Sequence, residues 1–139
     1  GFNMRSEGTS TPDYTIIGNT ITNNTLEGIL FRLTAAGGGM NALVQENTIT
    51  GNSDNGLQIS DASAGLSVID MGGGTLGSTG GNRIFGNTLQ DIRVDVDGNE
   101  AKAENNWWGV ATGLAGGETV LDDASTIDAD PFLTTDPNP

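Results

Sequence analysis

The 139-residue chain contains no cysteine and no histidine. Without cysteine it can form neither a disulfide nor a thiolate nucleophile. Without histidine it cannot build a Ser-His-Asp or Cys-His catalytic apparatus, or the usual histidine-containing zinc site. The enzyme classes that depend on these groups are therefore excluded.

Positive charge is also scarce, because five Lys and Arg stand against 18 Asp and Glu, for a formal net charge of −13. Nucleic-acid binding needs clustered Lys and Arg that neutralise phosphates, so we expect no nucleic-acid partner. Anionic membrane surfaces are disfavoured for the same reason. No apolar run is long enough to cross a bilayer, so we expect no membrane insertion. High acidity suits cation binding and solubility outside cells.

The chain does contain a repeat, in which a tripeptide beginning with asparagine occurs four times. The copies begin at Asn19, Asn47, Asn82 and Asn106, at spacings of 28, 35 and 24 residues. Their third residue is isoleucine in the first three copies and tryptophan in the fourth. A period between 20 and 50 residues is typical of a solenoid.

The repeating unit has the pattern of a short strand. A second asparagine follows each of the first three isoleucines by three residues, and an alternating apolar pair such as Ile29 and Phe31 comes soon after. These second asparagines are Asn24, Asn52 and Asn87. Asparagine and glycine stand at the breaks, and the 22 glycines argue against long helices. The pattern predicts an all-β fold, a parallel β-helix of about five rungs.

Superposing the repeats predicts four inward columns and one ladder. The columns are Ile21, Ile49, Ile84 and Trp108; Phe2, Ile29, Leu57 and Ile92; Met4, Phe31, Ile59 and Val94; and Ile16, Val44, Val68 and Ala103. The asparagines that open the four tripeptides should form the ladder, where their amides bond one another and the turn backbone.

The third rung carries a glycine-rich insertion. Val68 lies 24 residues after Val44, whereas Asn82 lies 35 residues after Asn47, which predicts 11 extra residues between Ile69 and Gly81. The lysine and the following helix of a phosphate-binding P-loop are absent. We expect a flexible loop or a glycine-lined turn packed on the coil.

The segment 19–29 has the pattern Asn-x-Ile-x-x-Asn-x-x-x-Gly-Ile, which resembles the repeat of right-handed parallel β-helix proteins of the pectin-lyase-like superfamily. The segment 103–109, with its Asn-Asn-Trp-Trp-Gly, resembles the closing rung of bacterial surface and secreted members, and 128–133 resembles their terminal strand. The resemblance implies β-helix rungs over 1–109, followed by a C-terminal cap and acidic tail over 110–139. Gly1 would then enter in the middle of a rung of a longer coil, and its open edge could pair with another chain.

Oxygen-bearing side chains alternate at Asp95, Asp97 and Asn99. Ca²⁺ prefers six to eight oxygen ligands, and alternate positions along a loop can supply them. These three residues are therefore our predicted calcium site, although the glycine falls at the fourth position instead of the sixth of an EF-hand. A plain turn at Asp97-Gly98-Asn99 that joins two strands is the favoured interpretation of this segment, and the three residues are where we expect calcium if the ion binds.

Catalytic candidates are weak. Lyases of this superfamily pair calcium with a basic residue, but Arg93 alternates with core positions and should pair outward with neighbouring carboxylates. Asp128 and Asp130 could share a strand face as two glycosidase carboxylates, but a solvated acidic tail is the favoured explanation of these residues. We assign no catalytic residue.

The favoured function is a structural or adhesive segment of an exported bacterial surface or secreted β-helix protein that contacts glycans. Its location would be extracellular or on the cell surface, and its partners a polysaccharide or a second copy joined at the open edge. The alternative is the C-terminal part of a polysaccharide lyase or hydrolase whose catalytic rungs lie upstream.

Overall fold

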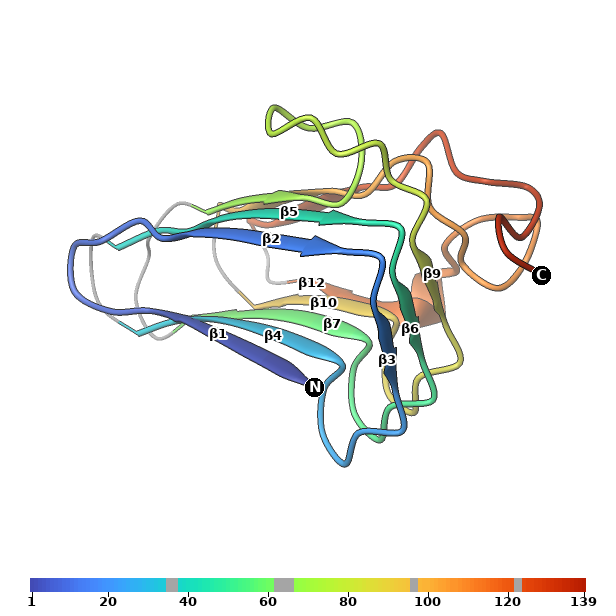
Figure 1. Ribbon diagram of the computed structural model, residues 1–139, viewed down its shortest axis with the longest axis horizontal. Helices are drawn as coiled ribbons and strands as arrows, with labels where there is room; N and C mark the ends of the chain where they lie inside the picture. The colour runs from blue at the N-terminus through green and yellow to red at the C-terminus, as the bar shows by residue number, and fades with distance from the viewer. Residues whose placement is uncertain (35–37, 62–66, 96–97, 122–123) are drawn as a thin grey trace.

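The computed structural model describes residues 1–34, 38–61, 67–95, 98–121 and 124–139, which coil into a parallel β-solenoid (Figure 1). Sheet A contains β1 (Phe2–Ser6), β4 (Ile29–Leu33), β7 (Leu57–Asp61), β10 (Ile92–Asp95) and β12 (Thr119–Leu121). Sheet B contains β2 (Asp13–Ile17), β5 (Asn41–Gln45), β8 (Val68–Asp70), β11 (Glu100–Lys102) and β13 (Thr126–Asp128). Sheet C contains β3 (Thr20–Thr22), β6 (Thr48–Thr50) and β9 (Arg83–Phe85).

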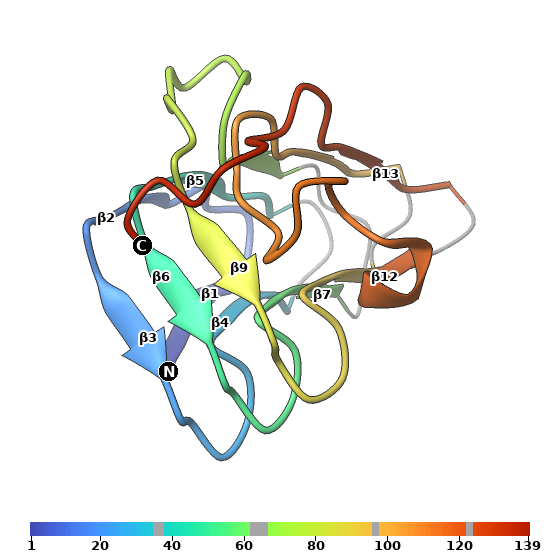
Figure 2. The ribbon, with the colours of Figure 1, turned by 90° about the vertical axis from the view of Figure 1, so that its right-hand side faces the viewer.

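Each turn of the coil visits the three sheets in the same order. The chain completes about four turns and continues with β12 and β13, which extend sheets A and B. Figure 1 shows sheets A and B as two facing layers, and Figure 2 shows sheet C closing one side. The only helical element in the described residues is the short 3-10 helix η1 (Gly116–Glu118), and no helix there is long and apolar enough to cross a membrane. The predicted all-β parallel solenoid is confirmed.

Strand register confirms three of the four predicted columns. In sheet C, Ile21 pairs with Ile49 and Ile49 pairs with Ile84. A bridge between Arg83 and Trp107 places Trp108 next in the same column. The columns that begin with Phe2 and Met4 run through sheet A as expected. Their inner members from Ile29 onward are fully buried, as the two-residue alternation of a strand requires.

The fourth column is wrong at one position. β8 pairs Val68 with Asn41, so Val68 points outward and is 38% exposed. Met71 takes the inner position beyond Val44 and is fully buried. A shift of three residues reverses the face of a strand, because side chains alternate with a period of two. Met71 lies 11 residues before Asn82 and Val44 lies three before Asn47, so the insertion is eight residues long instead of the predicted 11.

The glycine-rich insertion is a turn built around the buried carboxylate of Asp70. Oδ1 accepts the N–H groups of Gly72 and Gly74, both at 3.0 Å, and Oδ2 accepts those of Leu76 at 2.9 Å and Ser78 at 3.2 Å. A Cβ on Gly74 would lie 2.6 Å from the Asp70 carboxyl carbon, so glycine is needed there. The turn rises above sheet B (Figures 1 and 2). Of the two expected forms, the glycine-lined turn is the one observed.

The predicted asparagine ladder is confirmed at the corner between sheets B and C. The side-chain oxygen of each later asparagine accepts both the backbone and the side-chain N–H of the asparagine one rung before it. The remaining amide hydrogens bond backbone carbonyls at the ends of the sheet B strands, such as those of Ile16, Val44 and Ala103. The ladder thus satisfies backbone groups that the narrow coil would otherwise bury unpaired.

The C-terminal segment crosses the end of the coil and is held there by backbone hydrogen bonds, such as that from Leu133 to Asn106 at 2.9 Å, and by two side-chain contacts. Phe132 packs against the core, so closely to Gly113 that a Cβ there would lie 2.6 Å from its ring. Asp136 accepts two hydrogen bonds from the Arg83 guanidinium, at 2.6 and 2.7 Å. This forked geometry is the strong form of an Arg–carboxylate pair, and it joins residues 53 positions apart.

Candidate functional site

The outer face of sheet A collects most of the positive charge of the chain. Parallel register places Arg5 beside Arg32, and Asn3, Leu30, Gln58 and Arg93 in the neighbouring row. Arg5, Arg32 and Arg93 are three of only five basic residues in the sequence. Among the described residues Arg32 forms no ion pair, whereas Arg5 reaches Glu7 and Arg93 reaches Asp95. The face therefore presents two short rows of donors, Arg5 with Arg32 and Gln58 with Arg93, which together are called the donor row, in a protein that is otherwise strongly acidic.

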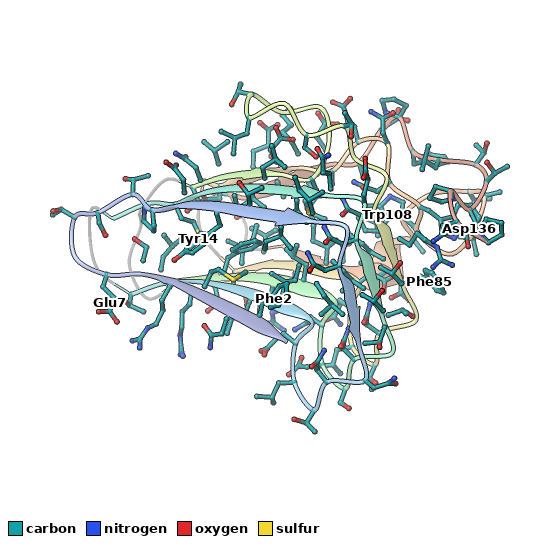
Figure 3. All side chains as sticks on the ribbon, in the orientation of Figure 1. Phe2, Glu7, Tyr14, Phe85, Trp108 and Asp136 are labelled. Atoms are coloured by element: carbon teal, nitrogen blue, oxygen red, sulfur yellow. The ribbon has the colours of Figure 1, made fainter. Side chains whose placement is uncertain are left out.

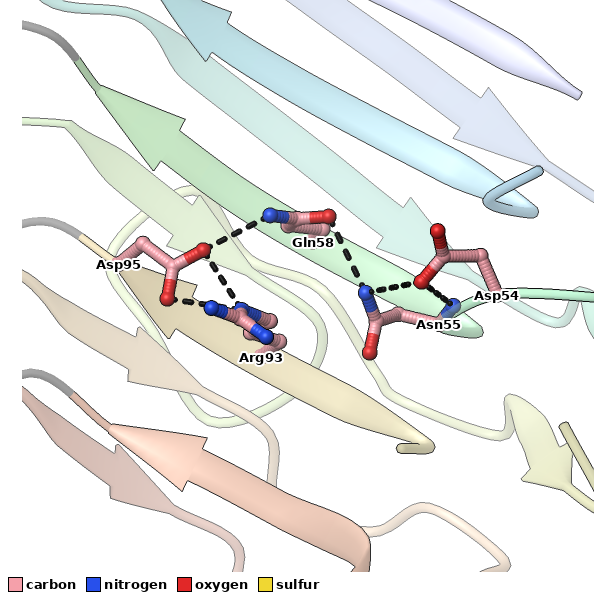
Figure 4. A network of polar contacts seen from close by, with 5 residues as sticks. All are labelled: Asp54, Asn55, Gln58, Arg93 and Asp95. Carbon is pink, nitrogen blue, oxygen red and sulfur yellow. Dashed lines mark hydrogen bonds and ion pairs between the residues drawn. The ribbon is translucent and has the colours of Figure 1, made fainter. Parts of the chain in front are cut away.

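A polar network orders the middle of this face (Figure 4). Arg93 Nε donates to both carboxylate oxygens of Asp95, at 2.8 and 2.7 Å, and Gln58 Nε2 donates to Oδ2 at 2.7 Å. Asn55 in turn donates to Gln58 Oε1 at 3.1 Å and to Asp54. The hydrogen bond to Asp95 raises the pKa of Arg93, so its guanidinium stays charged and is unsuited to act as a base.

The predicted calcium ligands have other contacts in this structure. Asp95 accepts hydrogen bonds from Arg93 and Gln58, as described above. Asn99 is buried, and its Oδ1 accepts the backbone N–H of Ser67 at 2.8 Å. Asp97 lies outside the described residues. Within the described part of the chain, no group of three or more Asp or Glu is placed to hold a metal ion. The calcium site stays a prediction.

Titration calorimetry with Ca²⁺ tests it directly. If Asp95, Asp97 and Asn99 bind the ion, the wild type should give a saturable heat at millimolar calcium. Asp97→Ala should remove that heat, because it deletes a ligand oxygen. Asp13→Ala, which removes an exposed carboxylate on β2, should leave it unchanged. Absence of heat from the wild type would retire the site.

Sheet B carries a smaller charged cluster on its outer face. Lys102 Nζ lies 2.8 Å from Asp128 and 3.0 Å from Glu100. The hydrogen bond from Lys102 lowers the pKa of Asp128, which keeps that carboxylate ionised. A general acid needs a raised pKa, so this environment disfavours Asp128 as the acid of a glycosidase pair. Asp122 and Asp123 lie outside the described residues.

A second ladder, which the sequence analysis did not predict, ends at a buried carboxylate. Asn24 donates to Asn52, and Asn52 donates to Asn87. Asn87 then donates from its side chain to Asp91 Oδ1 at 2.9 Å. Asp91 therefore stands where the next asparagine of the ladder would stand, and its carboxyl group is only 2% exposed.

The sequence contained a signal that an aspartate ends the second ladder. Asp91 stands where earlier rungs have Gly28 and Gly56. A Cβ on either glycine would lie 2.8 or 2.5 Å from the ladder amide of the following rung, so those positions require glycine. The residue 24 positions after Asn87 is Ala111, so the sequence offers no fourth asparagine at that spacing, and Asp91 accepts the Asn87 amide instead.

Burial raises the pKa of Asp91 to about 6, against the lowering effect of the Asn87 hydrogen bonds and with a contribution from the charge of Glu118. The folded state therefore holds the Asp91 proton more tightly than the unfolded chain does. Its contribution to stability falls as the pH rises from about 4 to about 6, and the loss is complete above that range.

We therefore expect Asp91→Asn to raise the free energy of unfolding at pH 7 by about 1–3 kcal/mol, because it removes the buried charge and keeps an acceptor for Asn87. The gain should shrink toward zero at pH 4. Denaturant unfolding of both proteins across this range measures the difference, with the exposed Asp13→Asn as the control. A difference that does not vary with pH would contradict the assignment.

Comparison with known proteins identifies one family. A family model described as "Protein of unknown function (DUF1565)" matches residues 2–112, which include β1 to β11. No curated protein and no solved structure matches the chain.

Proposed function

Because the chain belongs to the DUF1565 family, whose function is unknown, we propose from its structure that it is a structural or adhesive segment of an exported bacterial surface or secreted protein. In this role the outer face of sheet A contacts glycans. The proposed extracellular location is in keeping with the net charge of −13 and the absence of cysteine.

The observation that carries this proposal is the donor row on sheet A. Neighbouring parallel strands are about 4.8 Å apart, so equivalent side chains repeat at short, fixed intervals along the coil. Arg5 and Arg32 occupy equivalent positions on two successive strands, and Gln58 and Arg93 occupy equivalent positions, in the neighbouring row, on the next two strands. A row of this kind can donate hydrogen bonds to the oxygens of successive units of an extended polysaccharide.

The scaffold beneath this face suits a rigid display surface. The inner members of the sheet A columns are fully buried, and the two amide ladders tie neighbouring turns together. Among the described strands β1 pairs only with β4, and self-association through its other edge remains a proposal.

Affinity electrophoresis in gels that contain individual polysaccharides tests the proposed face. The wild type should be retarded by at least one polymer, and Arg32→Gln should weaken that binding about tenfold, since a charge-assisted hydrogen bond contributes roughly 1.5–3 kcal/mol. The matched control is Lys102→Gln, which removes the same charge from sheet B and should bind as the wild type does.

Two results would overturn the proposal. Failure of every acidic and neutral polymer to retard the wild type would remove glycan contact, and equal weakening in both variants would show a non-specific effect of charge. Release of reducing ends or unsaturated sugars by the purified chain would favour the enzyme alternative instead.

A further inference from the structure

A cavity lies at one end of the coil, away from the donor row on sheet A. It has a volume of about 290 Å³ and is bordered by β9, η1 and the turn that follows Trp108. Phe85, Trp108 and Val110 supply apolar walls, and Asp91 and Glu118 supply carboxylates. Figure 3 shows Phe85 and Trp108 at the same end of the molecule. Ligand pockets begin at about 300 Å³, so this one has room for a single small ring.

Two polar groups of the cavity residues lack partners in the described structure. Trp108 is 4% exposed, and its indole Nε1 is buried without a hydrogen-bond acceptor. An unsatisfied buried donor costs about 1–3 kcal/mol, so native structures rarely retain one without a reason. Both hydrogen bonds to the Asp91 side chain, from the backbone and the side chain of Asn87, end on Oδ1, and none in the described residues reaches Oδ2. One donor and one acceptor are therefore unsatisfied, and the side chains that cover the indole have to move before a ligand can reach the donor.

The Trp108 N–H and the Asp91 carboxylate together determine which class of ligand fits the cavity. A hydroxyl group can accept from the Trp108 indole and donate to the Asp91 carboxylate, so it meets both requirements. An ammonium group or metal ion cannot accept from the indole N–H. A carboxylate or phosphate cannot donate, and Asp91 and Glu118 would repel it. An aromatic wall also suits the apolar face of a ring.

We propose that this cavity binds one neutral polyhydroxylated ring, either a free monosaccharide or the terminal unit of a neutral glycan. The site is separate from the sheet A face and does not depend on the function proposed for that face. Trp108 donates to a ring oxygen or hydroxyl, Asp91 Oδ2 accepts from a hydroxyl, and Phe85 packs beside the ring.

The indole N–H resonances of the protein report on this site individually. The chain has only two tryptophans, and Trp107→Phe assigns which ¹H–¹⁵N indole signal belongs to Trp108. On titration with neutral hexoses and pentoses at millimolar concentrations, the Trp108 signal should move saturably as the N–H gains an acceptor. The Trp107 signal should stay in place. A Trp108 signal that no neutral sugar moves would overturn the proposal.

Asp91→Asn is the decisive variant. It replaces the available acceptor by an amide, and we expect the dissociation constant to rise about tenfold or more, because a hydrogen bond to a charged group is lost. Loss of fold is not a concern, because this variant is expected to be more stable than the wild type. The control is Asp130→Asn, an exposed carboxylate that does not line the cavity.

Three further outcomes would contradict the assignment. Unchanged affinity in Asp91→Asn would remove the carboxylate from the site, and equal shifts of both indoles would indicate a solvent effect. Glucuronate binding as tightly as glucose would show that the cavity does not select neutral ligands. The donor row can be tested separately through Arg32, so failure here leaves the proposed function standing.

Discussion

Replacing Asp70 with alanine should lower the free energy of unfolding by about 3–5 kcal/mol, because four backbone N–H groups would lose their common acceptor. Asp70 is fully buried beneath the glycine-rich turn that it organises. Within the described part of the chain these four N–H groups bond no other acceptor, and the packed turn would have to open for water to reach them.

Asp70→Asn refines this prediction. The amide oxygen can still accept from two of the four N–H groups, but the NH₂ group cannot accept from the others. The loss should therefore be smaller than in Asp70→Ala. Urea unfolding followed by tryptophan fluorescence measures both variants, and Asp13→Ala, at an exposed position, should change stability by about 0.5 kcal/mol or less. A small loss in Asp70→Ala would mean that the turn opens without affecting the coil.

The regular part of the fold could be predicted because its physical cause repeats along the chain. Ile49 and Ile84 occupy equivalent positions in successive turns, so the same alternation and the same asparagine turn mark them both. The prediction for Val68 was wrong because it matched Val44 to the apolar residue 24 positions later, whereas the residue that follows Val44 in register is Met71, 27 positions later. Val68 and Ile69 are both apolar, and nothing local tells which one faces the core.

The two buried acids, Asp70 and Asp91, show what a sequence repeat cannot predict. By strand register Asp70 lies on the outer row beside Leu43, and it is buried only because the turn that follows folds over it. Asp91 stands two residues before Arg93 in the sequence, yet it is buried and completes an amide ladder. Both outcomes depend on which residues are brought near by the coil, and a local pattern of charges does not contain that information.

The same limit applies to the candidate sites. The sequence pattern placed oxygen donors at Asp95 and Asn99 but could not indicate their partners. Gln58, which bonds Asp95, lies 37 residues away. The sheet A row was partly foreseeable, since Arg93 alternates with core residues on β10. The alignment of Arg5 with Arg32 follows from the register of β1 on β4, which the repeat had predicted correctly.

Asn82→Ala should be as damaging as the loss of Asp70, and its effect should depend on position within the ladder. Asn82 is fully buried, accepts two hydrogen bonds from Asn47, and donates from its side chain to Val44, Met71 and Asn106. Truncation leaves the Asn47 backbone N–H without an acceptor in the interior of the coil. We expect a loss of about 3–5 kcal/mol, because several buried groups become unsatisfied together.

Asn19→Ala is the matched control, since it removes the same side chain at the end of the same ladder. Its amide donates to Ile17 and Asn47, but no asparagine in the described structure donates to it. Its backbone N–H keeps its bond to Asn47 after truncation. We therefore expect a loss of about 1 kcal/mol or less. Denaturant unfolding followed by circular dichroism, with similar m-values for both variants, gives the comparison. Equal losses would mean that each asparagine acts through its own turn. A larger loss at Asn82 would show that the stability of the corner comes from the continuity of the ladder between turns.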